Sequence, residues 1–194
     1  FLLVLSHNTI HDPLLENQEL INKYQNKKGS EKKENNPTIG AMIETLDLSV
    51  GQIVKKLKNL KLFDNTLLIF CSDNGGNQKY ALQKPFKKGK GWLYEGGIRV
   101  PLIISWPRRI KNSFVSEQMT SSIDFLPTII NVANSGLNDK SFYDGIDISQ
   151  FFSNKSNLIN RRELYWHYPH YHSGSGMEPA SAIRWKDYKL IQWH

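Results

Sequence analysis

Residues 67–77, "LLIFCSDNGGN", join a strongly apolar run to two polar side chains and two glycines. The apolar residues at the start of this stretch fit a strand that is buried inside a sheet. In open α/β sheets, ligands bind beyond the carboxyl ends of the strands. Asp73 and Asn74, which follow the apolar run directly, therefore lie where such a fold builds its sites.

The segments on either side favour an α/β fold. Residues 38–63 repeat apolar side chains at intervals of three and four, which predicts a long amphipathic helix that Thr38 caps. Residues 98–106 predict a further strand, and residues 122–134 a short helix that begins at Pro127 or just before it. A helix, a short turn and an apolar strand make half of an α/β unit, so we expect a mostly parallel central sheet.

The two ends of the sequence also resemble strands. Residues 1–6, "FLLVLS", predict a buried strand, and residues 161–194 are rich in aromatic residues and alternate as antiparallel strands do. We expect a larger domain at residues 1–159 and the start of a small C-terminal subdomain at residues 160–194. Domains seldom begin and end inside a strand, so the sequence predicts a fragment of a longer protein.

The formal net charge is +7, and the lysines gather in two polar segments. One of them mixes lysine with glutamate and asparagine, as solvated loops do, and the sequence contains no nucleic-acid-binding module. We therefore expect no nucleic-acid partner. No apolar run reaches the roughly eighteen residues of a membrane-spanning helix, so we expect no membrane span.

Adjacent Asp73 and Asn74 offer two hard oxygen ligands, which suit Ca²⁺ or Mg²⁺ better than a soft metal. The same four residues, Asp-Asn-Gly-Gly, are also common turn formers. Considered alone, this pattern favours a plain turn over a metal site.

Six motifs stand in a fixed order along the chain: "HDP" (11–13), "AMIETLDLSVGQIVKKL" (41–57), "DNTLLIFCSDNGG" (64–76), "GKGWLYEGGIRVPLIISWP" (89–107), "SIDFLPTI" (122–129) and "DGIDISQFF" (144–152). In this order they strongly resemble the sulfatase family, the formylglycine-dependent sulfuric ester hydrolases of the alkaline-phosphatase-like fold. Later segments, "HYPHY" and "ASAIRWKDYKLI", look like the C-terminal subdomain of bacterial arylsulfatase A-like members. The resemblance implies that residues 1–159 are the later part of the catalytic domain.

The resemblance also implies roles for four residues. Asp73 and Asn74 match two ligands of the family's metal ion, usually Ca²⁺ with Mg²⁺ as an alternative. Lys90 matches the lysine that contacts the sulfate, and His11 matches the histidine that reaches the sulfate oxygens and assists the leaving group. A metal site and a lysine suit the reaction, because a divalent metal and a fixed ammonium both stabilise the negative charge that spreads over the sulfate oxygens.

Other readings of these residues remain open. Lys90 lies among Lys84, Lys87 and Lys88, so spacing alone does not select it, and His11 also fits a loop histidine bonded to the main chain. His167 and His170 lie among aromatic residues, which fits a sugar-binding rim and fits an aromatic contact between subdomains equally well.

The family's nucleophile is a formylglycine made from the first residue of a C-x-P-S-R-type motif, which this sequence lacks. Cys71 does not fit that motif. We expect the formylglycine and the remaining metal ligands in a missing N-terminal half, so the isolated chain should be inactive. The expected substrate is a sulfated small molecule or glycan. The alternatives are a phosphate or phosphonate ester hydrolase of the same fold and a non-catalytic sulfated-glycan-binding protein. Family members are commonly exported or lysosomal.

Overall fold

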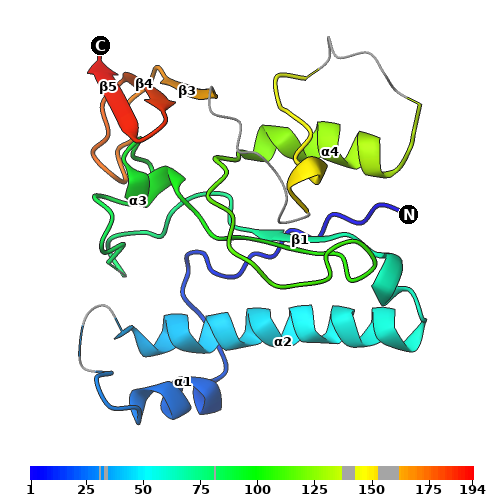
Figure 1. Cartoon of the computed structure of the whole chain (residues 1–194). Coiled ribbons are helices and arrows are strands. Elements are labelled where there is room, and N and C mark those ends of the chain that lie inside the picture. Colours follow the sequence, from blue (N-terminus) through cyan, green and yellow to red (C-terminus); the bar gives the residue numbers. More distant parts are fainter. Residues whose placement is uncertain (31, 33–34, 81, 137–142, 153–161) are drawn as a thin grey trace. The chain divides into compact units, whose positions relative to one another are not determined.

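A computed structural model describes residues 1–30, 32, 35–80, 82–136, 143–152 and 162–194 (Figure 1). The predicted α/β class is confirmed, with helices, a two-stranded sheet and a three-stranded antiparallel sheet. The chain divides into two compact units. The first unit comprises Phe1–Ile104 and His172–Met177, and the second comprises Ser105–Tyr171 and Glu178–His194.

The elements of the first unit include the predicted long helix and the two strands that follow it. They are α1 (Gln18–Gln25), α2 (Pro37–Asn59), the 3₁₀ turn η2 (Phe63–Asn65), β1 (Leu68–Cys71), α3 (Glu95–Ile98) and β2 (Leu102–Ser105). Strands β1 and β2 pair with each other, and α1 packs beside α2 (Figure 1). The long helix and the strand before Asp73 are therefore confirmed. Within the described residues, no helix combines the length and the apolar character that a membrane crossing requires.

The start of α2 differs from the prediction that Thr38 caps it. The side-chain oxygen of Asn36 accepts hydrogen bonds from the main-chain N–H groups of Thr38 (3.0 Å) and Ile39 (3.2 Å), so Asn36 is the cap. Pro37 occupies the first helical position, where its fixed φ angle suits a helix and its missing N–H costs nothing. The proline therefore moves the start of the helix ahead of Thr38.

The strand predicted at residues 1–6 is wrong. These residues form no strand, and the side chains of Phe1 and Val4 are 90% and 79% exposed. A strand needs main-chain hydrogen-bond partners from a neighbouring strand, and an apolar sequence does not supply them. Within the described residues, no strand pairs with this segment.

The second unit contains η3 (Ser122–Asp124), α4 (Phe125–Val132), η5 (Ser149–Phe152) and the strands β3 (Glu163–Tyr168), β4 (Ala180–Trp185) and β5 (Tyr188–Trp193). The three strands pair antiparallel in the order β3-β4-β5, which confirms the prediction for the tail. Helix α4 begins just before Pro127, as predicted. The expected subdomain boundary at residue 160 lies outside the described residues and stays a prediction.

A buried ion pair holds the second unit together. The carboxylate of Asp124 is fully buried and contacts the guanidinium of Arg162, which is 8% exposed, at 2.5 Å. The same carboxylate accepts hydrogen bonds from the N–H groups of Ser121 (2.7 Å) and Ile146 (3.0 Å). Asp124 thus satisfies donors from three separate segments. This role was not predicted from the sequence, although Ser121 and Asp124 have the spacing of a capping box.

Candidate active site

The structure brings Lys90 and His11 together, although 79 positions separate them in the sequence. The ammonium of Lys90 lies 3.0 Å from Nε2 of His11, and Nδ1 of His11 lies 2.9 Å from the main-chain oxygen of Asp12. An ammonium only donates and a carbonyl oxygen only accepts, so both contacts are satisfied when Nδ1 carries the proton and Nε2 accepts from Lys90. His11 does bond to the main chain, but its other nitrogen is turned toward the predicted sulfate-contacting lysine.

The surroundings of Lys90 distinguish it from its neighbouring lysines. The ammonium of Lys87 lies over the ring of Tyr94, 4.3 Å from its centroid, and that of Lys88 lies 3.9 Å from the ring of Trp92. The ammonium of Lys90 instead meets an imidazole nitrogen, and its side chain is half-buried. Of these three lysines, Lys90 is therefore the one whose ammonium lies beside a second group, an imidazole, that can also contact an anion.

Two main-chain hydrogen bonds join the loop that contains Lys90 to the loop that contains Asp73 and Asn74. The N–H of Lys90 donates to the carbonyl of Gly76 at 3.0 Å, and the N–H of Gly75 donates to the carbonyl of Gly97 at 2.8 Å. The predicted sulfate-contacting and metal-binding residues therefore belong to one locally bonded structure.

Glycines allow these loops to approach so closely. A Cβ atom on Gly75 would lie 1.7 Å from the carbonyl oxygen of Gly96, and one on Gly97 would lie 2.0 Å from the carbonyl oxygen of Trp92. Main chain therefore packs directly on main chain, which only glycine permits. Gly96 and Gly97 belong to a single helical turn, Glu95–Ile98, that precedes β2.

Replacing Gly75 with alanine is expected to destabilise the chain by about 1–3 kcal/mol, because the main chain must move to admit the methyl group. Gly51 provides the control, because its added Cβ atom meets nothing within 4 Å inside helix α2. Gly51→Ala is expected to raise stability by about 0.5–1 kcal/mol. Urea unfolding of both variants measures these changes. Equal stability of the two variants would contradict the close packing of the loops.

The side chains of Asp73 and Asn74 are available for a cation. Asp73 is exposed, Asn74 is half-buried, and Oδ1 of Asp73 accepts a hydrogen bond from the N–H of Asn74 at 2.9 Å. A carboxylate and an amide oxygen fit Ca²⁺ or Mg²⁺, and Ca²⁺ takes about six to eight oxygen ligands. Within the described residues, no group of three or more histidine, cysteine, aspartate or glutamate side chains is placed to hold a metal ion. The two residues therefore fit part of a coordination shell.

Cys71 lacks the setting of an activated nucleophile. Partial desolvation raises the pKa of its thiol above the ordinary value, and the nearby Asp73 carboxylate raises it further. A raised pKa leaves less thiolate at neutral pH, and thiolate is the reactive form. This setting agrees with the absence of a nucleophile motif around Cys71.

A segment from the far end of the chain also contacts the Lys90 loop, and this contact was not predicted from the sequence. The indole Nε1 of Trp92 donates a hydrogen bond to the main-chain oxygen of Ser175 at 3.1 Å. A Cβ atom on Gly91, whose φ is +82°, would lie 2.6 Å from Oγ of Ser175. The stretch "HSGSGM" (172–177) has the composition of an ordinary flexible loop, so it gave no signal of this contact.

His167 and His170 lie in the second unit and have separate partners. Nδ1 of His167 lies 2.8 Å from Oγ of Ser181, and that oxygen lies 2.9 Å from Nε2 of His194. The ring of His170 packs against the ring of Tyr168 at a centroid distance of 4.3 Å. These contacts are compatible with both interpretations of the two histidines, so their substrate-binding role stays a prediction.

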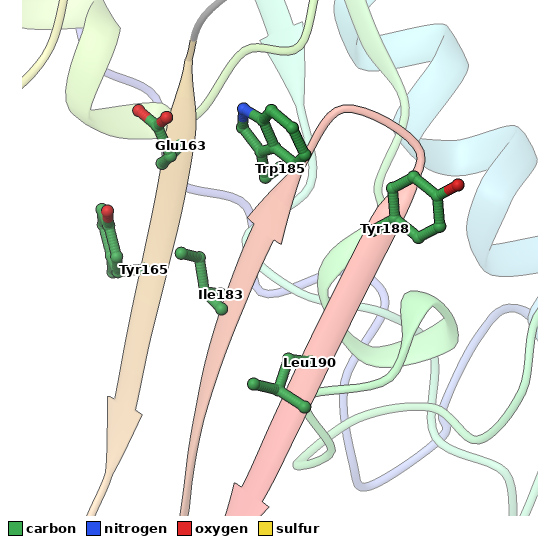
Figure 2. Close-up of a pocket in the computed structure, with 6 residues that line it drawn as sticks. All are labelled: Glu163, Tyr165, Ile183, Trp185, Tyr188 and Leu190. Carbon is green, nitrogen blue, oxygen red and sulfur yellow. The ribbon is translucent and has the colours of Figure 1, made fainter.

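One face of the three-stranded sheet forms a shallow hollow of about 440 Å³ (Figure 2). Its lining comes from all three strands: Glu163, Tyr165, Ile183, Trp185, Tyr188 and Leu190. Side chains two positions apart on a strand share a face, so His167 lies on the same face as Tyr165. An aromatic surface beside His167 is what a sugar-binding rim needs, although it serves a protein contact equally well.

Comparison with protein families gives two matches that together span the chain. Residues 1–135 match the model described as Sulfatase. Residues 86–194 match the model described as N-sulphoglucosamine sulphohydrolase, C-terminal.

Individual relatives are similar along nearly the whole chain. A sulfatase from Formosa agariphila is 31% identical, covering 96% of this chain and 36% of its own length. Human steryl-sulfatase is 31% identical, covering 95% of this chain and 30% of its own length. The crystal structure of Ps i-CgsB in complex with k-i-k-neocarrahexaose superposes with a TM-score of 0.80 at 30% identity, over 95% of this chain and 39% of that one. The chain thus spans roughly a third of the length of these proteins.

Proposed function

Since the chain belongs to the sulfatase family, as its ordered motifs predicted, we propose that it contributes one part of the active site of a sulfuric ester hydrolase. The contact between Lys90 and His11 is the observation that supports this function best. It pairs an ammonium with an imidazole nitrogen at 3.0 Å, next to the loop of Asp73 and Asn74. These are the groups that a sulfate ester needs on its oxygens.

The charge of the reacting sulfate determines the role of Lys90. Cleavage of a sulfate ester spreads negative charge over the sulfate oxygens and the leaving oxygen. The contact with His11 holds the ammonium of Lys90 beside the imidazole, and turning from Nε2 to a sulfate oxygen would let the ammonium stabilise this charge. An anion that binds here would replace the imidazole nitrogen as the acceptor for the Lys90 ammonium.

The same exchange defines the role of His11. Once the ammonium turns to the sulfate, Nε2 of His11 is released and can take up a proton from solvent, and the resulting imidazolium can donate that proton to the leaving oxygen. The bond from Nδ1 to the main-chain oxygen of Asp12 restricts rotation of the ring and leaves Nε2 as the nitrogen that would face the leaving oxygen.

Asp73 and Asn74 would hold a divalent cation, Ca²⁺ in the first instance, through their side-chain oxygens. A bound cation would stabilise negative charge on the sulfate oxygens. The fixed loop geometry supports this assignment, because the Asn74 N–H orients the Asp73 carboxylate at 2.9 Å. The remaining ligands and the nucleophile, a formylglycine, would come from residues beyond this chain.

A sulfated carbohydrate is the substrate class that the comparisons favour. The family model that matches residues 86–194 is described by a sulphoglucosamine activity, and the solved structure with a TM-score of 0.80 holds a neocarrahexaose. A sterol sulfate is the alternative, because human steryl-sulfatase is equally similar to this chain by identity.

Replacing Asp73 with alanine in the whole protein is expected to lower Ca²⁺ affinity by roughly tenfold or more, and turnover of an aryl sulfate with it. Asp47→Ala is the matched control, because Asp47 is an exposed residue on helix α2. Elemental analysis gives the metal content, and the release of the aryl alcohol gives the turnover. If the Asp73 variant kept its metal, Asp73 would not be a ligand. If the wild-type protein cleaved no sulfate ester, the proposed function itself would fail.

A further inference from the structure

The loop around Lys90 carries an unusual charge distribution. Between Asp73 and Glu95 the sequence contains no acidic residue, and it contains five lysines: Lys79, Lys84, Lys87, Lys88 and Lys90. We call the first four of these lysines the lysine patch. A balanced, solvated surface would mix acidic with basic side chains, so this segment departs from that pattern.

Aromatic rings hold three ammonium groups of the lysine patch without neutralising them. Lys79 lies over Tyr80 at 5.1 Å, Lys87 over Tyr94 at 4.3 Å and Lys88 over Trp92 at 3.9 Å. A ring attracts a cation through its quadrupole but carries no net charge, so the positive charge remains available. Among the described residues, none of these lysines lies within 4.0 Å of a carboxylate oxygen.

Local contacts place the patch next to Lys90. A Cβ atom on Gly89 would lie 2.8 Å from the side chain of Gln78, which precedes Lys79. The carbonyl of Gly76 accepts from the N–H of Lys90 at 3.0 Å, and the N–H of Gly76 donates to the side chain of Gln83, which precedes Lys84, at 3.3 Å. Lys87 and Lys88 lie within three positions of Lys90. The patch therefore extends the positive surface outward from the proposed sulfate-contacting residue.

The nearby carboxylates reduce this charge only in part. The pKa of Lys79 is raised chiefly by Tyr80 and least by Asp12, and the carboxylate of Glu95 is paired with Arg99 at 3.7 Å. Asp73 would have its charge taken up by the cation that the proposed function assigns to it. The ammonium groups of Lys84, Lys87 and Lys88 remain as a surplus beyond what a single sulfate group requires.

We infer that this site takes a substrate with several anionic groups, such as a multiply sulfated oligosaccharide, whose further sulfates contact the lysine patch. This inference rests on the proposed function at Lys90. A single sulfate ester on an uncharged body, such as a sterol sulfate, would leave the patch unused. The structure therefore favours a polyanionic carbohydrate over a sterol as substrate.

The test compares two probes that differ in charge, glucose 6-sulfate and sucrose octasulfate, in ligand-observed NMR titrations of the whole protein with Ca²⁺ present. The octasulfate is expected to bind at least about tenfold more tightly at low salt, because each further exposed ion pair contributes modestly and several act together. In roughly 0.5 M NaCl this advantage is expected to shrink, because the Debye length falls to a few ångströms.

Two triple variants with the same change in net charge show whether the tighter binding of the octasulfate depends on the lysine patch or on net charge alone. Changing Lys84, Lys87 and Lys88 together to glutamine is expected to weaken octasulfate binding about tenfold and glucose 6-sulfate binding less than about twofold. Changing Lys28, Lys55 and Lys56 to glutamine, all exposed elsewhere in the first unit, is expected to change neither affinity by more than about twofold.

Equal affinity for the two probes, or equal losses in the two sets of variants, would overturn the inference. The proposed function fails by a different result, which is an unchanged affinity for glucose 6-sulfate in the Lys90→Met variant.

Discussion

Asp124→Ala is expected to lower the free energy of unfolding of the second unit by about 3–5 kcal/mol, because removing one partner of a buried ion pair strands the other charge. The guanidinium of Arg162, 8% exposed, would lose its carboxylate, and the N–H groups of Ser121 and Ile146 would lose their acceptor. Domains of this size are stable by only about 5–15 kcal/mol, so this unit of the variant should unfold at a denaturant concentration well below the midpoint of the wild-type transition.

Chemical unfolding, followed by the fluorescence of the tryptophans, measures this loss. Glu117→Ala is the control, because Glu117 is exposed in the same unit and its replacement should change stability by less than about 0.5 kcal/mol. A loss below about 1 kcal/mol for Asp124→Ala, the range of an exposed pair, would show that the ion pair does not hold this unit together.

Lys90→Met in the whole protein is expected to lower turnover of an aryl sulfate by about 100- to 1000-fold, the usual effect of removing one donor that stabilises developing negative charge. Methionine keeps much of the length of the side chain and removes its charge. The Ca²⁺ content is expected to stay unchanged, because Lys90 is not among the proposed ligands. This combination distinguishes Lys90 from Asp73, whose replacement should lower metal content and turnover together.

The matched control for this variant is Lys55→Met, which removes the same charge from an exposed position on helix α2. An aryl sulfate carries a single charge, so the lysine patch does not complicate the comparison. If Lys90→Met retained wild-type turnover, or if both variants lost it equally, Lys90 would have no specific role in catalysis.

The elements that the sequence predicted well are those determined by local periodicity. Helix α2 combines apolar spacing of three and four residues with a cap and a proline at its start. Each of these local signals favours a helix. The antiparallel strands of the tail alternate clearly along residues 163–193 and pair as expected. Short-range signals of this kind require no knowledge of the rest of the fold.

Features that depend on distant partners were predicted poorly. Residues 1–6 are apolar enough for a buried strand, but strand formation requires a neighbouring strand. The ion pair between Asp124 and Arg162 joins residues 38 positions apart, so no local sequence pattern predicts it. The cap at Asn36 was missed for a local reason, because Pro37 changes where the helix begins.

The candidate site shows the same division. The motif order identified Lys90 and His11, whereas spacing alone could not choose Lys90 among its neighbours. Their contact at 3.0 Å and the aromatic partners of Lys87 and Lys88 became visible only in three dimensions. The side-chain oxygens of Asp73 and Asn74 indicate a site for a hard cation, but the sequence does not show which other ligands complete the coordination shell.

A crystal structure of the whole protein with Ca²⁺ and a bound, uncleaved sulfate ester would test most directly whether this chain forms part of a sulfatase site. We expect the ammonium of Lys90 at roughly 2.7–3.0 Å from a sulfate oxygen, with oxygens of Asp73 and Asn74 at about 2.3–2.6 Å from the cation. A sulfate ester bound elsewhere, with the contact between Lys90 and His11 unbroken, would contradict the proposed function.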